Sequence, residues 1–149
     1  MDARAQLFND IKGAIASRVE EIKHVGLWNQ EMAALEDDAP YELPALFIEF
    51  GNIEWGTYAK GEEDYDRFAV GEGQVKYHLL CGWHNETDDL LPFLLSEKVN
   101  NALAAIPNSA IYSVFYPSMT YTNHDHADIV ESGEAFKVKY YRSISSSRK

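Results

Sequence analysis

The clearest strand signal in this chain is the stretch Gln74-Val-Lys-Tyr-His-Leu-Leu-Cys-Gly-Trp83, and it decides the fold class. Successive side chains of a β-strand point to opposite faces of a sheet. Because apolar residues occupy every second position here, the stretch predicts a strand with one face in the core. The side chains expected on that face are Val75, Tyr77, Leu79, Cys81 and Trp83.

Four further stretches show strand signals. The strongest is Ala45-Leu-Phe-Ile-Glu-Phe50, which places three apolar side chains on one face and is expected to continue toward Trp55. The others are a short alternation around Val25 and Leu27 and two later runs over residues 111–122 and 136–144.

Two stretches, 7–22 and 91–106, carry apolar residues at spacings of three and four, which is typical of amphipathic helices. The first helix is expected to end near Lys23, and the second is ended by Pro107. Candidate N-caps are Asp2 for the first helix and Thr87 and Asp88 for the second.

The elements therefore follow the order α-β-β-β-α-β-β. Helices separated by groups of strands favour an α+β fold, with a single mixed or antiparallel sheet and two helices packed on one face. No composition shift or internal repeat divides the chain, so residues 1–149 are expected to form one domain. The polar residues 145–149 are expected to fray.

The composition excludes several classes of protein. The apolar fraction of 46% and the charged fraction of 25% are ordinary for a folded globular chain. A formal net charge of -11 disfavours general nucleic-acid binding, because the surface repels phosphate backbones. We see no signal peptide and no apolar run that could span a bilayer, so the chain is expected to be made in the cytoplasm, without a membrane partner.

Cysteine and histidine give no catalytic motif. Cys81 is the only cysteine, and it lies on the apolar face of its strand, so we interpret it as a small buried hydrophobic residue. His78 and His84 lie on the opposite face, with no nucleophile motif nearby, and are expected to be exposed. We expect no enzyme activity and no cofactor.

The segment Asn123-His-Asp-His-Ala-Asp128 contains residue types that bind zinc. Two histidines separated by one residue point the same way only on an extended strand, and a site would need further ligands from elsewhere. A polar turn between two strands is the preferred interpretation, with no metal. A metal-dependent hydrolase that uses the cluster from His124 to Asp128 remains the weaker alternative.

A long connection, from Gly56 to Gly73, separates two of the predicted strands. Loops longer than about 12–15 residues are uncommon and are usually functional. This one contains an acidic run without the spacing of a calcium-binding loop, and two glycines that indicate a flexible turn. Together with a basic C-terminal end, its aromatic residues suggest an interface between copies of the chain, and the residues expected there are Tyr58, Tyr65, Phe68, Lys137 and Arg142.

Several of these stretches carry a resemblance to a known family. The first helix followed by Val25-Gly-Leu-Trp-Asn29, the stretch Leu43-Pro-Ala-Leu-Phe-Ile-Glu-Phe-Gly-Asn-Ile-Glu-Trp55 and the turn Asn123-His-Asp-His126 resemble a family of phage and prophage structural proteins. The order of elements is similar to that of tail terminator and tail completion proteins, small α+β subunits that form rings at the head-proximal end of a phage tail.

The resemblance implies a component of the virion. It implies a ring of copies, for which a hexamer is one expected size, in contact with neighbouring tail or neck proteins. DNA would pass through such a ring without specific binding, because acidic residues in the channel repel phosphate. A small acidic adaptor or immunity-type protein that binds one basic partner is the alternative, since it explains the acidity equally well.

Overall fold

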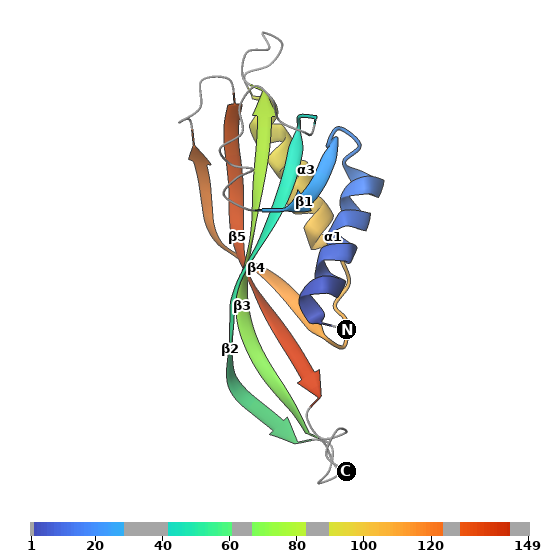
Figure 1. Ribbon diagram of the computed structural model, residues 1–149, viewed down its shortest axis with the longest axis vertical. Helices are drawn as coiled ribbons and strands as arrows, with labels where there is room; N and C mark the ends of the chain where they lie inside the picture. Colours follow the sequence, from blue (N-terminus) through green and yellow to red (C-terminus); the bar gives the residue numbers. More distant parts are fainter. Residues whose placement is uncertain (1, 29–41, 61–66, 83–89, 124–128, 144–149) are drawn as a thin grey trace.

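The computed structural model describes residues 2–28, 42–60, 67–82, 90–123 and 129–143. Two helices cover one face of a twisted five-stranded sheet (Figure 1). The observed order of elements is the predicted one, so the α+β fold class is confirmed. The elements are α1 (Ala3–Arg18), β1 (His24–Leu27), β2 (Ala45–Lys60), β3 (Arg67–Gly82), α3 (Leu91–Ala104), β4 (Tyr112–Asn123) and β5 (Ile129–Ser143).

The sheet is mixed, with the strand order β1-β2-β3-β5-β4. The short strand β1 pairs in parallel with the first four residues of β2, and every other neighbouring pair is antiparallel. The strand β3 lies in the centre of the sheet, between β2 and β5. The stretch that decided the fold class therefore forms part of its central strand.

The helix α1 begins as the sequence predicts and ends earlier. The Asp2 carboxylate caps it by accepting a hydrogen bond from the backbone N–H of Arg4, at 2.8 Å. The helix ends at Arg18 and not near Lys23, because Val19 leaves the helical conformation with a φ of -131°. The Val19 side chain is fully packed in the core, so the chain turns here toward β1.

The helix α3 has the predicted apolar spacing, but its start differs from the prediction. Leu90 occupies the N-cap position and makes no side-chain capping bond, and Pro92 stands in the first turn, where proline is tolerated. Thr87 and Asp88, the candidate N-caps, lie outside the described residues. The prediction that either residue caps α3 was wrong, because Leu90 is the N-cap.

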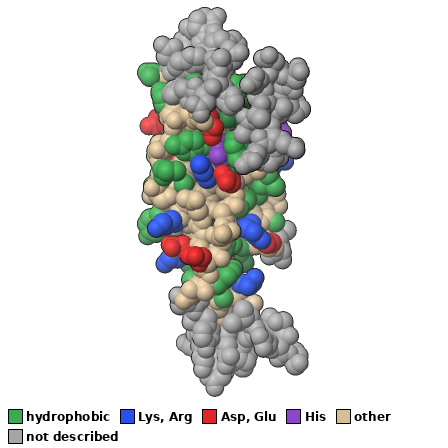
Figure 2. All heavy atoms as spheres, turned by 60° about the vertical axis from the view of Figure 1, so that its left-hand side comes forward, with side chains coloured by type: hydrophobic (Ala, Val, Ile, Leu, Met, Phe, Trp, Pro, Cys, Tyr) green, Lys and Arg blue, Asp and Glu red, His purple; other side chains and the backbone are tan. Residues whose placement is uncertain are grey.

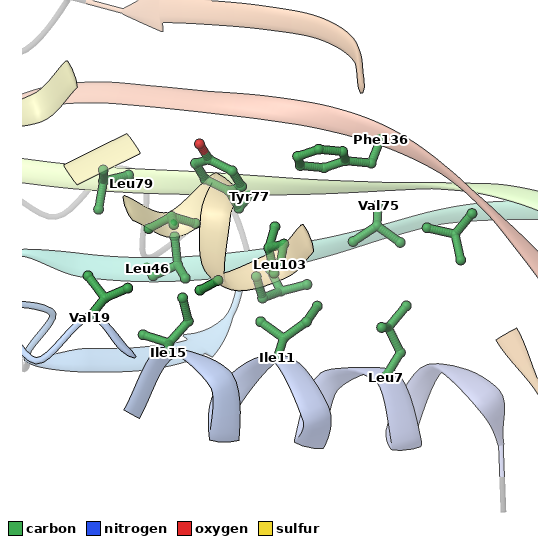
Figure 3. Close-up of a cluster of buried hydrophobic side chains, with 14 of the residues drawn as sticks. Leu7, Ile11, Ile15, Val19, Leu46, Val75, Tyr77, Leu79, Leu103 and Phe136 are labelled. Atoms are coloured by element: carbon green, nitrogen blue, oxygen red, sulfur yellow. The ribbon is translucent and has the colours of Figure 1, made fainter. Parts of the chain in front are cut away.

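Both helices pack against the same face of the sheet and form one core with it (Figure 3). Side chains of α1 spaced by four residues point at the sheet, and α3 adds a second row beside them. The predicted apolar face of β3 is confirmed in the described residues, where Val75, Tyr77, Leu79 and Cys81 are all buried. Trp83, which the sequence places on the same face, lies outside those residues.

The predicted loop from Gly56 to Gly73 was wrong. The strands β2 and β3 continue in antiparallel register as far as the pair Lys60↔Arg67, so most of this segment is a β-hairpin. Two shifts in the register interrupt the β2 side, which is why the sequence shows no clean alternation there. Gly71 and Gly73 lie within β3 and do not form a flexible turn.

The last strand was predicted to begin at residue 136, but β5 begins at Ile129. The missed residues include Glu131, Ser132 and Glu134, whose polar side chains conceal a strand from any search for apolar alternation. All three are buried, because partners from both sides of the sheet bind them. The backbone pairs with β3 over the whole missed segment.

Candidate functional site

One end of the sheet extends beyond the helix layer as a three-stranded arm (Figure 1). We define the arm as residues 54–60 of β2, 67–72 of β3 and 139–143 of β5, which are paired with one another in register. The N-terminus of α1 lies at the base of the arm. The arm is therefore a projection whose helix-side face is open to other molecules.

A tryptophan and an arginine stack on the helix-side face of the arm. Trp55 lies across Gly71, where a Cβ atom would come within 2.7 Å of the indole ring. The guanidinium carbon of Arg142 lies 4.6 Å from the centre of that ring, which is a cation–π contact. Gly71 is thus required for close approach, since any larger residue would push Trp55 off the sheet and away from Arg142.

A cavity of about 600 Å³ opens beside this stack. Its walls are the first residues of α1, the arm, and the segment at Ile111 that precedes β4. Trp55 is 37% exposed within it, which is high for so large an aromatic side chain. The lining residues that carry charge are Asp2, Arg4 and Arg142.

The charges in the cavity are arranged around α1. The Arg4 side chain donates two hydrogen bonds to the Asp2 carboxylate, at 2.8 and 3.1 Å. These bonds and the backbone N–H of Arg4 lower the pKa of Asp2 to about 2. Asp2 is thus neutralised by Arg4, and Arg142 gives the cavity a net positive charge.

The structure separates the residues predicted for an interface. Arg142 lies in the cavity, whereas Lys137 lies on the opposite face of β5, because their spacing of five places them on different sides of the strand. Phe68 is half-buried and lines a second cavity that shares Arg142 with the first. Tyr58 belongs to β2 in the arm, and Tyr65 lies outside the described residues. Tyr58 and Phe68 therefore lie in strands and not in the loop that the sequence predicted.

Sequence reasoning missed a polar cluster on the face of the sheet opposite the helices. We call it the His78 cluster, and it contains Trp28, Glu49, His78, Tyr121 and Glu131. The ring nitrogens of His78 lie 2.6 Å from a Glu131 oxygen and 2.7 Å from a Glu49 oxygen. The Trp28 ring stacks on the imidazole at 3.5 Å, and the Tyr121 hydroxyl donates to Glu131 at 2.7 Å.

The prediction that His78 is exposed was wrong, because its side chain is only 3% exposed. Its strand face was predicted correctly, but Trp28 and Tyr121 cover that face. Both ring nitrogens of His78 are within hydrogen-bond distance of a carboxylate oxygen, and the Tyr121 hydroxyl lies 2.7 Å from Nδ1. The cluster is thus a buried hydrogen-bonded network, with no face of the imidazole left for a substrate.

The carboxylate of Glu131 is held ionised in this cluster. Burial, the largest influence, raises the pKa of Glu131, but the hydrogen bonds from His78 and Tyr121 outweigh it, and the pKa lies below its ordinary value. Burial, followed by the bond to Glu131, raises the pKa of Tyr121 far above its ordinary value. Tyr121 therefore stays protonated and donates. These directions agree with a structural role.

Two features of the sequence could have pointed to the cluster. One is Trp28, a large aromatic residue directly after β1. The other is Gly133, which lies within β5, directly opposite both His78 and Tyr121 in the sheet. A glycine inside a strand marks a close approach of other atoms. Here the Tyr121 ring occupies the space above Gly133, within 2.6 Å of where a Cβ would be.

The remaining candidates for chemistry are a buried thiol and residues outside the described ranges. Cys81 is fully buried, as predicted, and burial raises the pKa of its thiol to about 12. His84 and the segment 124–128 lie outside the described residues. Among the residues that are described, no group of three histidine, cysteine or acidic side chains is placed to hold a metal ion.

The absence of bound metal is a direct prediction for this chain. We expect purified protein to contain no stoichiometric transition metal, because the segment from His124 to Asp128 offers too few ligands at suitable spacing. Elemental analysis of the wild type, beside a His124→Ala/His126→Ala variant, tests this. One zinc ion per chain that disappears in the variant would contradict it, as would a large loss of stability in the variant.

The charges on the molecular surface are mixed. On the face shown in Figure 2, acidic and basic side chains lie next to one another across the middle of the molecule, with hydrophobic side chains toward its margins. The edge strand β4 exposes Tyr116 and Met119, at 60% and 50%. No helix in the described ranges is long and apolar enough to span a bilayer.

Comparison with known proteins gives a structural likeness only. Among solved structures, the chain is similar to a chain from the virion of a native gene transfer agent (GTA) particle, with 10% sequence identity, coverage of 91% of each chain and a TM-score of 0.40. No protein-family model matches the chain, and no curated protein matches it. We therefore base the functional proposal on the residues and surfaces of the chain itself.

Proposed function

We propose that this chain is a structural protein of a tailed-phage or prophage particle, acting as a ring-forming tail terminator, tail completion or neck subunit. The observation that carries the proposal is the arm, a paired extension of the sheet that carries an exposed tryptophan beside a positively charged cavity. Aromatic and arginine side chains are enriched where proteins bind one another. An arm of this kind is suited to contact a neighbouring copy.

Two further properties support an assembly role over catalysis. The His78 cluster, on the face opposite the helices, is covered by Trp28, and the buried Cys81 thiol has a raised pKa. The sequence resemblance to phage structural proteins runs through β2 as far as Trp55, so it includes the base of the arm. The residues of the resemblance and those of the proposed contact surface thus overlap.

The net charge of -11 fits a ring through which DNA passes. A channel lined by acidic groups repels phosphate and does not retain the nucleic acid. The acidic run Glu62-Glu-Asp64 and Asp66 follow directly after the arm strand β2. Acidic groups at this position would either line the channel or meet a basic surface of the next subunit.

The aromatic residues of the arm and its hairpin provide the test. We expect the variant Tyr58→Ser/Tyr65→Ser/Phe68→Ser to lose higher assembly while its monomer stays folded, because anchor residues at an interface supply most of the binding energy. Sedimentation velocity and negative-stain images of concentrated protein report assembly, and circular dichroism reports folding.

A matched control is Phe93→Ser, which removes an aromatic side chain that is 48% exposed on α3, at the other end of the molecule from the arm. We expect it to assemble like the wild type. A wild-type chain that remains monomeric at high concentration, and also with its particle partners present, would favour the adaptor alternative over the ring.

A further inference from the structure

We infer that the cavity formed by Arg4, Trp55 and Arg142 is the receptor for the acidic segment Gly61-Glu-Glu-Asp-Tyr-Asp66 of a second copy of the chain. The inference rests on the proposed self-assembly and gives it a specific contact. It names the two surfaces that meet and the chemistry that joins them.

The cavity has the chemistry of a carboxylate and aromatic receptor. The Arg142 guanidinium is held in place by its stack on Trp55, so less side-chain freedom is lost when it binds a carboxylate. Trp55 is 37% exposed and presents an apolar face for an incoming ring. Arg4, in the first turn of α1, is already paired with Asp2, so the charge left over for a carboxylate is that of Arg142.

The segment 61–66 has the complementary composition. Four of its six residues are carboxylates and one is Tyr65. It joins Lys60 and Arg67, which are paired at the end of the arm. The residues that flank it in the sequence, Lys60 and Arg67, lie at the outer end of the arm, while the cavity lies at the base.

A second copy is the more suitable source of this segment than the same chain. Five residues of β2 separate Trp55 from Lys60, which is about 16 Å of extended strand directed away from the cavity. A contact between unlike surfaces of two copies is heterologous, and repetition of such a contact generates a ring when the rotation closes. The inferred contact thus leads to the proposed assembly.

The strand edges are less suited to join the copies. Pro117 and two shifts of register interrupt the outer strand β4, and two further shifts interrupt β2. Proline and bulges of this kind block the addition of another strand at an edge. Contact through side chains in the cavity does not require a regular edge.

A pair of charge-reversed variants tests the contact. The cavity variant is Arg4→Glu/Arg142→Glu, and the segment variant is Glu62→Lys/Glu63→Lys/Asp64→Lys. Each variant alone places like charges at both surfaces and is expected to stay monomeric. An equimolar mixture restores opposite charges at every contact and is expected to assemble with alternating subunits, as measured by sedimentation velocity.

A binding measurement on the monomer separates this inference from the proposed function. We use a capped synthetic peptide of residues 61–66, and a control peptide in which the four acids are replaced by their amides. Arg142→Glu is expected to weaken binding of the acidic peptide at least about tenfold, since close charge pairs at interfaces contribute more than 1.4 kcal/mol. The wild-type chain is expected to bind the amide peptide with the same low affinity that the Arg142→Glu variant shows for the acidic peptide.

The outcomes are distinct. If the wild type assembles and both charge-reversed variants assemble equally well, the cavity is not the receptor, although the assembly role stands. If the wild type never assembles, the proposed function fails. Binding of the acidic peptide to the monomer then tests by itself whether the cavity is a receptor. A peptide that binds wild type and Arg142→Glu with equal affinity overturns the inference in either case.

Discussion

Replacement of Gly133 by alanine is expected to destabilise the chain at the upper end of the roughly 1–3 kcal/mol typical of overpacked cores. Gly133 lies on β5 between His78 of β3 and Tyr121 of β4. A Cβ atom there would overlap the carbonyl oxygen of Tyr77 and would lie 2.5 Å from the Tyr121 ring. The Tyr77 carbonyl oxygen cannot move without disturbing the pairing of β3 with β5, so the substitution destabilises the whole sheet.

Gly13→Ala in α1 is the matched control. Apart from the adjoining backbone of α1, no atom of the described residues lies within 4 Å of a Cβ atom at Gly13. Alanine is also the better helix former, so stabilisation by about 0.5–1 kcal/mol is expected. Urea denaturation of both variants therefore gives opposite signs for the same chemical change. A Gly133→Ala protein as stable as the wild type would contradict the register between β3, β5 and β4.

The elements that the sequence predicts well are those in which one face is apolar and the other is polar. Leu7, Ile11 and Ile15 keep helical spacing because they contact one surface of the sheet. Val75 and Leu79 alternate because the helices cover one face of β3. In these segments the apolar positions along the chain are the ones that are buried.

The arm could not be predicted in the same way. It lies beyond the helix layer, so its strands need no continuous apolar face, and glycines replace apolar residues where Trp55 crosses β3. The pairing of β2 with β3 and of β3 with β5 holds these strands together. The pairing of β3 with β5 joins residues far apart in the sequence, and the register shifts in β2 hide the β2–β3 hairpin from a search for alternation.

The His78 cluster was missed for a related reason. Polar and charged side chains are mostly exposed unless they are paired, so His78 was expected on the surface. They lie opposite each other only after β3 and β5 have paired, and Trp28 covers them from a distant part of the chain. The partners that make their burial possible are 53 residues apart in sequence.

We expect His78→Ala to lower the free energy of unfolding by about 3 kcal/mol, the upper end of the cost of leaving a buried polar group without its hydrogen-bond partner. The substitution removes the His78 contact of the Glu131 carboxylate, whose side chain is 11% exposed, and leaves it only the hydrogen bond from Tyr121. It also removes the ring on which Trp28 stacks. Thermal or urea denaturation measures the loss.

The double variant His78→Ala/Glu131→Gln separates the charge from the packing. Glutamine keeps the shape of the side chain and removes the orphaned charge, so the double variant is expected to be more stable than His78→Ala alone. Glu131→Gln in the wild-type background should instead destabilise, because it weakens the contact with His78. Additive effects of the two substitutions would show that the pair is not coupled.

The pH dependence gives an independent test of the same pair. Glu131 has a pKa below its ordinary value of 4.5 in the folded chain, so its ionised form is favoured by folding. This contribution to stability is fully present above pH 4.5 and is lost as the pH falls through the lower folded pKa. Removal of His78 takes away the first of the hydrogen bonds that lower this pKa, while the burial that raises it remains. The unfolding free energy of His78→Ala should therefore fall less steeply below pH 4.5 than that of the wild type, and equal slopes would show that Glu131 does not depend on His78.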